Sequence, residues 1–416
     1  MRINKSKTHI YIILKKMKLY FLLIKRIFLL SLFYCLLGIS SKAQNVVNVV
    51  HEQSIDTSGF SDSAHHWYDI YDEGKLINFL SHRPKYKITE IEKIADNILL
   101  FQKSNGGWPK NYDMRAILAD EQRDTILRAK EETNTTFDNG ATHSQVDYLA
   151  KAFLATKFER YRDACLKGID FMLLAQYPNG GWPQYYPDTS GYRKYITFND
   201  GAMIGVMKVF QNILDHKPEY LFVDSVRYAK VREAFDKGID CILKCQIKQY
   251  GKLMAWGQQH DNVDFHPQNA RKFEPAALSG DESADIVLLL MSLDHPSPEI
   301  ILTIQSAVKW LYDSRIFGIR VNTIEAPKKV YKYSTSTIDR VVVIDPNATP
   351  IWTRFYELGT NRPLFCNRDE IPVFSLAEVE RERRSGYTWY HYEPERVFKE
   401  YPKWQKKWDP GNNMLK

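Results

Sequence analysis

An internal repeat is the feature that most constrains what this chain of 416 residues can fold into. The phrase Gln-Lys-Ser-Asn-Gly-Gly-Trp-Pro at 102–109 returns as Gln-Tyr-Pro-Asn-Gly-Gly-Trp-Pro at 176–183. A repeat of roughly 60–75 residues is typical of a fold that stacks copies of one supersecondary unit. A second phrase, KGID, occurs at 167–170 and 237–240. A third phrase occurs as FDNGA at 137–141 and FNDGA at 198–202, with a fainter copy, LSGDESA, at 278–284.

Each repeated unit carries the pattern of two amphipathic helices. Residues 141–157 and 161–176 both place apolar side chains at helical spacing, and an Asn-Gly-Gly phrase ends the second. Asp138 or Asn139 is the predicted N-cap of the first helix, with its side chain near the unpaired amides of the first turn. The other helices are predicted at 200–215, at 226–247, from Asp281 onward, and through 301–314.

These helices predict an all-α fold with few short strands, because strand-like β-branched runs are scarce outside 341–344. Helical hairpins repeated in this way suggest a ring whose equivalent loops gather on one face, and an open solenoid is the alternative. The Asp-Asn-Gly loops and the Asn-Gly-Gly-Trp-Pro loops are expected at opposite ends of the helix pairs. We interpret the tryptophan loops as structural turns whose glycines permit positive φ; stacking of Trp108 and Trp182 on sugar rings is the functional alternative.

The N-terminal segment 1–43 has the layout of a secretory signal peptide. It carries nine lysines or arginines and no acidic residue, and an apolar run at 27–39 follows its basic part. Small residues then lead to Ala43, so cleavage is expected after this residue. The apolar run is short for a membrane span of ~20 residues. We therefore expect an exported protein, secreted or periplasmic, with no membrane association in its mature form.

Removal of this leader changes the charge balance. The whole chain has 57 basic and 50 acidic residues, and 48 basic residues remain without the nine of the leader. The mature chain is then nearly neutral, which removes the main support for nucleic-acid binding. We predict an N-terminal extension at 44–84, packed on a main domain at 85–416. Free thiols and disulfides both remain open for the four cysteines of the mature chain, which are Cys165, Cys241, Cys245 and Cys366.

Two helix starts are candidates for a metal site. Asp138 is followed by Asn139, and Asp200 is preceded by another asparagine in the equivalent phrase. If the repeats form a ring, these oxygen-rich turns meet on one face. Carboxylate and amide oxygens are the ligands of a hard cation such as Ca²⁺. Each aspartate is also explained as a simple N-cap with no further role.

Basic residues gather downstream in aromatic-rich loops punctuated by Gly and Pro. The loops are 270–275, 352–356 and 359–369, and they contain Arg271, Arg354, Arg362 and Arg368. The guanidinium group matches the planar geometry of a carboxylate. Carboxylates and arginines together, without a cluster of Cys and His, favour an acidic ligand bridged by a metal ion.

With these residues in view, the chain resembles the helical pectate lyases of polysaccharide lyase family 10. The resemblance covers about residues 85–400 and lies in an ordered set of phrases. These are QKSNGGWPKN, TFDNGATHSQ, YPNGGWPQYYP, YITFNDGAM, AWGQQHD, ARKFEPAALSG, RFYELGTNRPLF and GYTWY.

The resemblance implies an (α/α)₃ toroid that binds Ca²⁺ and cleaves polygalacturonate by β-elimination. By position, it implies calcium ligands at Asp138, Asn139 and Asp200, a Brønsted base at Arg271, and substrate carboxylates held by Arg354, Arg362 and Arg368. We add His260, Lys272 and Trp182 as expected substrate contacts, and His260 is the rival base because its unperturbed pKa suits neutral pH. A monomer is expected.

Two other functions remain open. A glycoside hydrolase acting on uronides needs two carboxyl groups on either side of the bond that it cleaves, and Asp138 with Asp200 is a candidate pair. A non-catalytic polyuronate-binding protein would keep the arginines and could dispense with Arg271. Formation of an unsaturated product separates a lyase from both.

Overall fold

The computed structural model describes residues 54–68, 84–332 and 334–416. The predicted signal peptide at 1–43 lies outside these residues, as does much of the predicted extension at 44–84. The chain from Ser54 to Lys416 is one compact unit. Within the described ranges, no helix is long and apolar enough to cross a membrane.

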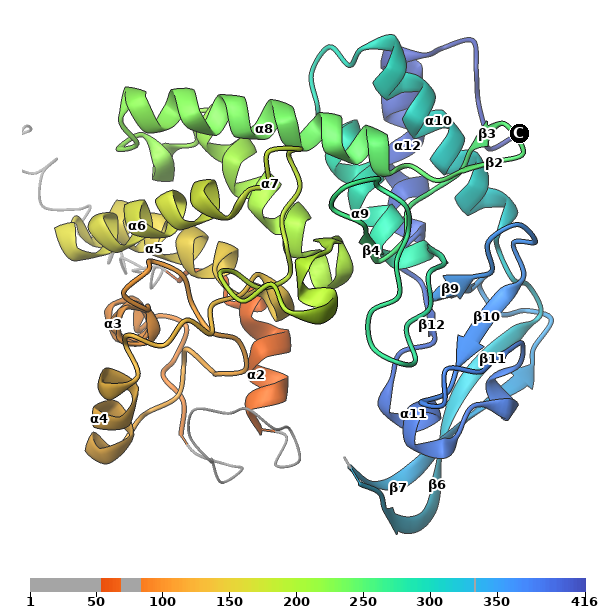
Figure 1. Ribbon diagram of the computed structural model, residues 1–416, viewed down its shortest axis with the longest axis horizontal. Helices are drawn as coiled ribbons and strands as arrows, with labels where there is room; N and C mark the ends of the chain where they lie inside the picture. Colours follow the sequence, from red (N-terminus) through yellow and green to blue (C-terminus); the bar gives the residue numbers. More distant parts are fainter. Residues whose placement is uncertain (1–53, 69–83, 333) are drawn as a thin grey trace, which may run out of the picture. The chain divides into compact units, whose positions relative to one another are not determined.

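Most of this unit is helical, and its long helices form two neighbouring rows (Figure 1). The first row is α3 (Ile91–Phe101), α6 (Glu159–Ala175), α8 (Ser225–Cys245) and α10 (Pro298–Asp313). The second row is α5 (His143–Thr156), α7 (Ala202–Leu214), α9 (Gly280–Met291) and α12 (Glu395–Trp408). The described residues also form three short helices: α2 (Ser61–Tyr68), α4 (Asp120–Arg128) and α11 (Arg381–Gly386). The helical pairs predicted from periodicity are confirmed as α5–α6, α7–α8 and α9–α10.

Repeated glutamines link successive helices of the first row. Each glutamine stands just after the end of one helix and donates its side-chain amide to a backbone carbonyl in the next helix of the row. The links are Gln102 to Ala164 (2.9 Å), Gln176 to Ala234 (2.7 Å) and Gln246 to Thr303 (3.1 Å). Because a side-chain amide that leaves water is costly unless it is hydrogen-bonded, these bonds hold each glutamine in place between helices and explain why glutamine recurs at the start of the repeated phrase.

The repeated tryptophans are buried plugs between helices. Trp108 and Trp182 are fully buried, and each indole Nε1 donates to a backbone carbonyl 2.8 Å away at the end of the preceding helix. A Cβ atom added at Gly168 would lie 2.9 Å from the ring of Trp108, and one at Gly238 would lie 3.2 Å from the ring of Trp182. The KGID and Asn-Gly-Gly-Trp-Pro phrases recur together because they pack on each other. The structural interpretation of these loops is confirmed, and the expected substrate contact of Trp182 is wrong.

The predicted helix caps are also wrong. Residues Asp138–Gly140 form a separate turn in which Asn139 has a φ of 51°. Helix α5 begins after Thr142, so neither Asp138 nor Asn139 caps it. In the equivalent repeat, α7 begins after Gly201. The Asp138 carboxylate is instead bound by the side chains of Lys110 and Gln184.

Most strands are short, as predicted, but one hairpin is not. Strands β6 (Ile319–Val330) and β7 (Thr335–Ile344) pair antiparallel over most of their length, and the predicted run at 341–344 is only the end of β7. The two-residue pairs are β1 (Ile196–Thr197) with β4 (Gln259–His260), β2 (Lys248–Gln249) with β3 (Lys252–Leu253), and β8 (Trp352–Thr353) with β12 (Tyr390–His391). A four-stranded sheet has the order β11 (Pro372–Val373), β10 (Pro363–Cys366), β9 (Phe355–Tyr356), β5 (Leu278–Ser279).

The described part of the N-terminal extension packs on this framework. Helix α2 buries Trp67 completely, and the hydroxyl of Ser63 donates to the carbonyl of Asn139 at 2.9 Å. This segment therefore supports the turn that carries Asp138. All four cysteines of the described chain are buried free thiols: Cys165, Cys241, Cys245 and Cys366.

Candidate active site

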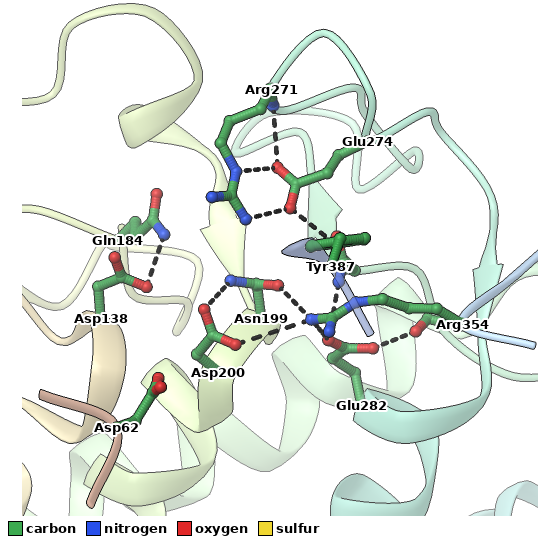
Figure 2. Close-up of polar contacts among 12 residues, drawn as sticks. Asp62, Asp138, Gln184, Asn199, Asp200, Arg271, Glu274, Glu282, Arg354 and Tyr387 are labelled. Carbon is green, nitrogen blue, oxygen red and sulfur yellow. Dashed lines mark hydrogen bonds and ion pairs between the residues drawn. The ribbon is translucent and has the colours of Figure 1, made fainter. Parts of the chain in front are cut away.

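A cavity of about 740 Å³ contains six of the ten residues singled out from the sequence. The six are Asp138, Asn139, Asp200, Arg271, Arg354 and Arg368. A volume of this size lies within the range of ordinary small-ligand sites, about 300–1,000 Å³. Figure 2 shows four of them converging from different elements. We call the three oxygen donors the acidic side of the cavity and the three arginines its arginine side.

On the acidic side, Asp138 is held by two residues that follow the tryptophan loops. Gln184 donates to Asp138 Oδ1 at 2.9 Å, and Lys110 forms an ion pair with the other carboxylate oxygen. Burial by itself would raise the pKa of Asp138, but the charge and hydrogen bond of Lys110 outweigh it and lower the pKa. Asn139 donates its amide to Asn111 Oδ1 at 2.8 Å. Asp138 is therefore an anchored, charged group.

Lys110 and Gln184 occupy equivalent positions in the repeat, each directly after Trp-Pro. Their contact with Asp138 shows that the tryptophan loops and the Asp-Asn-Gly turn lie at the same end of the helix pairs. The backbone agrees, because Thr136 N donates to Trp108 O at 3.0 Å and Phe137 N to Gln184 O at 3.0 Å. The expectation of opposite ends is wrong: the two loops are paired by backbone hydrogen bonds.

Asp200 is the least compensated carboxylate of the acidic side. Its partners are the amide of Asn199 and, at 3.7 Å from Oδ1, the guanidinium of Arg354 (Figure 2). Burial and the nearby charge of Asp138 raise the pKa of Asp200 to about 7. Asp62 of α2 also lines the cavity and acts on Asp200 in the same direction.

Arg354 is the most enclosed arginine of the site, with 8% of the residue exposed. Its Nη2 donates to Asn199 Oδ1 at 3.0 Å and to Glu282 Oε1 at 3.1 Å, and its guanidinium lies 4.8 Å from the ring centre of Tyr387. Burial would lower the pKa of Arg354, but Tyr387 and Glu282 outweigh it and hold the pKa well above the ordinary value. The guanidinium is held charged and in one orientation.

Arg271 is held by a carboxylate three residues away. Its Nε lies 2.8 Å from Glu274 Oε2, and its Nη2 lies 2.5 Å from Oε1, which gives a bidentate pair. Tyr387 donates to the same Oε1 at 2.9 Å. Burial would lower the pKa of Arg271, but the charge of Glu274 outweighs it and raises the pKa well above the ordinary value. The side chain is 45% exposed, so Arg271 faces the cavity in its charged form.

Arg368 repeats this arrangement with a second arginine beside it. Arg368 and Arg383 each make a bidentate pair with Glu382, at 2.6–3.0 Å. Both guanidinium groups lie about 5 Å from the ring of Phe273, at 5.1 and 4.8 Å. Against the effect of burial, the hydrogen bonds from Arg368 and Arg383 lower the pKa of Glu382 to about 2. One carboxylate between two arginines leaves a net positive surface toward the cavity.

Four of the predicted substrate contacts are absent from the described lining of the cavity: Trp182, His260, Lys272 and Arg362. Trp182 is the buried plug described above. Lys272 and Arg362 are exposed and pair with Glu370 (3.1 Å) and Glu357 (3.0 Å). His260 is fully buried, accepts a hydrogen bond from Gly257 N at Nε2, and lies 2.8 Å from Phe265 O through Nδ1. Burial lowers the pKa of His260 to about 4, so both its geometry and its protonation fit a structural role.

The cavity also contains residues that the sequence did not single out. Arg340 of β7 donates to Tyr387 O at 2.7 Å, and within the described chain no carboxylate lies within ion-pair distance of it. Lys110 and Gln184 could have been found from the sequence, because they occupy equivalent positions in the repeat. Glu282 lies in the third copy of the acidic phrase, at 278–284, but its pairing with Arg354, 72 residues away in the chain, could not be predicted from spacing.

The donors of the acidic side fit a calcium ion. They offer carboxylate and amide oxygens, which Ca²⁺ prefers. The raised pKa of Asp200 indicates that this carboxylate, unlike Asp138, has too little positive charge around it, and a divalent cation would supply that charge. Asp138, Asn139 and Asp200 are the residues that would hold it.

Comparisons with known proteins agree with this geometry. A family 10 polysaccharide lyase from Cellvibrio cellulosa, solved as a mutant in complex with trigalacturonic acid, is 29% identical, with a TM-score of 0.66 over 76% of this chain and 92% of that one. Another structure of a family 10 polysaccharide lyase from Cellvibrio cellulosa is 26% identical, with a TM-score of 0.64 over 85% of this chain and 98% of that one. None of the curated proteins compared with the chain matches it.

The family comparison accounts for the segment that builds the site. The family model described as pectic acid lyase matches residues 102–398, which include both sides of the cavity. The helices from α4 to α11, the repeated loops and the cavity arginines lie inside this match. The chain belongs to the pectic acid lyase family.

Proposed function

We propose that the protein is a secreted pectate lyase that cleaves α-1,4-polygalacturonate by calcium-assisted β-elimination and releases 4,5-unsaturated oligogalacturonides. The observation that carries this proposal is the division of the cavity into two sides. One side offers amide oxygens and two carboxylates, of which Asp200 is under-compensated, and the other offers charged arginines held by buried glutamates. Both sides of the cavity can bind an acidic sugar. Ca²⁺ would bridge the sugar to the acidic side, and the arginines would bind it on the other side.

The arginine side binds and polarises the uronate. Arg354 and Arg368 present oriented, charged forks to a substrate carboxylate. Arg340 adds a guanidinium that has no carboxylate partner among the described residues. Positive charge at the C6 carboxylate stabilises the electron density that develops there when the C5 proton leaves. The calcium ion supplies the same kind of charge when bound.

Arg271 is the proposed base. It takes the C5 proton, the electron pair of that bond forms the C4–C5 double bond, and the C4–O bond breaks with its pair going to the leaving sugar, which is then protonated. Arg271 must be neutral to do this, and Glu274 opposes neutralisation. The proposal therefore requires a rate that climbs with pH, because the small neutral fraction grows as the proton concentration falls.

The finer organisation follows the same proposal. The pairs α5–α6, α7–α8 and α9–α10 are proposed as the three hairpins of an (α/α)₃ toroid. The glutamine links between successive helices support it. We further propose cleavage of a signal peptide after Ala43, a catalytic domain at 85–416, and a monomer in solution.

The test is a turnover assay of the purified mature protein on polygalacturonate, with Ca²⁺ or with a chelator. We expect ultraviolet absorbance from the conjugated product with Ca²⁺, none with chelator, and recovery when Ca²⁺ is restored. Reducing ends without this absorbance would instead support a hydrolase that uses Asp138 and Asp200. Binding without any product would support a non-catalytic polyuronate-binding protein.

A further inference from the structure

A second cluster of metal-ligand side chains lies outside the described lining of the cavity, where α9 meets the β8–β12 pair. It consists of Asp281 in the first turn of α9, His391 in β12, and Glu393 two residues later. One ligand atom from each of the three side chains lies within 4.8 Å of the others. Figure 1 shows α9 and β12 as neighbours in this part of the fold.

The imidazole of His391 shows which of its nitrogens faces the cluster. His391 is 4% exposed, and its Nε2 lies 3.1 Å from the carbonyl oxygen of Thr353. A carbonyl only accepts hydrogen bonds, so Nε2 carries the proton. In the neutral ring, Nδ1 then presents a lone pair toward Glu393, whose Oε2 is 3.1 Å away. Nδ1 is buried and has no correctly oriented hydrogen-bond partner in the described chain.

With Nδ1 unprotonated, this arrangement places three electron-rich donor atoms within 4.8 Å of one another, and either a proton on Nδ1 or a bound cation would relieve their repulsion. The hydrogen bond from Nε2 to Thr353 is the support that metal-binding histidines ordinarily have, since their second nitrogen commonly donates to a backbone carbonyl.

We propose that Asp281, His391 and Glu393 form a second divalent-cation site that takes Zn²⁺ in preference to Ca²⁺. One imidazole nitrogen with two carboxylate oxygens is a donor set that zinc accepts, whereas Ca²⁺ prefers oxygen alone. A tetrahedral ion with bonds of about 2.1 Å needs donors about 3.4 Å apart. The Glu393 side chain is 44% exposed and has room to rotate into that geometry, and water completes the coordination.

The ion would join two elements that position the buried arginine of the cavity. Asp281 precedes Glu282, whose carboxylate holds Arg354. His391 of β12 pairs with Trp352 of β8. Trp352 precedes Arg354 by two residues in the chain. The site does not touch the substrate cavity, so its role is to fix α9 against β8 and β12.

The experiment uses the full chain, stripped of metal and then supplied with one equivalent of Zn²⁺ in excess Ca²⁺, which keeps zinc from the acidic side of the cavity. We expect elemental analysis after gel filtration to find one zinc per chain, and the melting temperature to rise. Co²⁺ in place of Zn²⁺ should give visible absorption bands that report a nitrogen ligand.

Two variants and one control test the named ligands. His391→Ala and Glu393→Gln should each weaken zinc binding at least tenfold and remove the cobalt bands. Glu393→Gln keeps the fold secure, because this side chain is largely exposed. His266→Ala is the matched control: His266 lies 3.2 Å from Asp264 on the surface and is not part of the cluster, so this variant should bind zinc as the wild type does.

Three results would overturn the site. The first is no zinc retained by the wild-type chain in excess Ca²⁺. The second is equal retention in His391→Ala and Glu393→Gln, which would place the ion elsewhere. The third is a doubly protonated His391 ring by NMR at neutral pH that stays unchanged when Zn²⁺ is added, because a proton alone would then bridge the cluster.

Discussion

The two sides of the cavity differ in how their charges are compensated. On the arginine side, each guanidinium has a buried glutamate: Glu274 for Arg271, Glu282 for Arg354, and Glu382 for Arg368. On the acidic side, Asp138 has Lys110, but Asp200 is left with a pKa raised to about 7. Buried charges need partners. One side is therefore complete without a ligand, and the other is completed by a cation.

This contrast implies opposite responses to loss of a carboxylate. A neutralised acid behind the arginine side leaves a buried cation unpaired. A neutralised acid on the acidic side relieves repulsion. The difference also explains why the positive groups are rigid while the candidate metal ligands include a group close to titration. Six substitutions test the contrast, four as main variants and two as companions, in order of decreasing effect.

The largest effect is expected from Arg271→Lys. Lysine keeps the charge but loses the fork and changes the reach, so kcat should fall about 10³-fold if Arg271 transfers the proton, while KM changes little. Glu274→Gln is the companion variant. Loss of the glutamate charge lowers the pKa of Arg271, so the rise of kcat with pH should begin at lower pH. Steady-state kinetics across alkaline pH measure the kcat of both variants. A near-normal kcat in Arg271→Lys would show that Arg271 is not the base.

Glu282→Gln should destabilise the protein by about 3 kcal/mol. Removal of one partner from a buried ion pair leaves the other charge uncompensated, and the side chains of Arg354 and Glu282 are only 10% and 3% exposed. Denaturant unfolding in chelator measures the change. An unchanged free energy of unfolding would show that Asn199 and Tyr387 hold Arg354 without Glu282, and the arginine side would not depend on its glutamates.

Asp200→Asn should do the reverse and stabilise the metal-free protein by about 1–2 kcal/mol at about pH 8. The folded chain holds a proton on Asp200 that the unfolded chain releases between about pH 4 and 7, so wild-type stability falls as pH rises through this window. The asparagine amide does not titrate, so the variant does not lose stability in this way. The free energies of unfolding of the two proteins should become equal near pH 4. Melting curves in chelator at both pH values measure it.

The same variant should not respond to calcium. Added Ca²⁺ should raise the melting temperature of the wild type and leave that of Asp200→Asn unchanged, because a ligand is missing. A destabilised Asp200→Asn protein at pH 8 would contradict the description of the acidic side as under-compensated.

The smallest effect is expected from Arg362→Ala. Its side chain is 55% exposed, pairs with Glu357, and lies outside the described cavity lining. Exposed ion pairs contribute about 0–1 kcal/mol, so stability and kcat/KM should stay near those of the wild type. Arg340→Ala is the contrasting variant, and KM should rise several-fold because a cavity guanidinium is lost. A large loss in Arg362→Ala would return this residue to the site.

The sequence by itself determined the helices and the pairing of the acidic residues. Helical periodicity is a local property, set by 3.6 residues per turn, so α5 to α8 could be placed within a few residues. The repeat also brought Asp138 and Asp200 together, because equivalent turns of adjacent units lie side by side. The sequence also placed four arginines in aromatic-rich loops, the resemblance to a family gave them roles, and three of the four line the cavity.

Only the tertiary structure decided which groups are buried and which partners they have. WGQQHD looks like a polar loop, yet the fold encloses His260 and satisfies both its nitrogens. Trp256 and Trp352 continue the tryptophan plugs, each with an indole bond of 2.8 Å to a helix carbonyl, although their flanking phrases have diverged. The common position is visible only in space.

The charge state of the site is likewise a tertiary property. The pKa of Asp200 depends on burial and on a carboxylate from another repeat, and that of Arg354 depends on Glu282 at a distance in the chain. Coulomb energies vary with the separation of charges and the surrounding dielectric. Sequence spacing specifies neither quantity. Residue types and helical faces can therefore be predicted from this chain, whereas the compensation of its charges follows from how the helices and loops close around them.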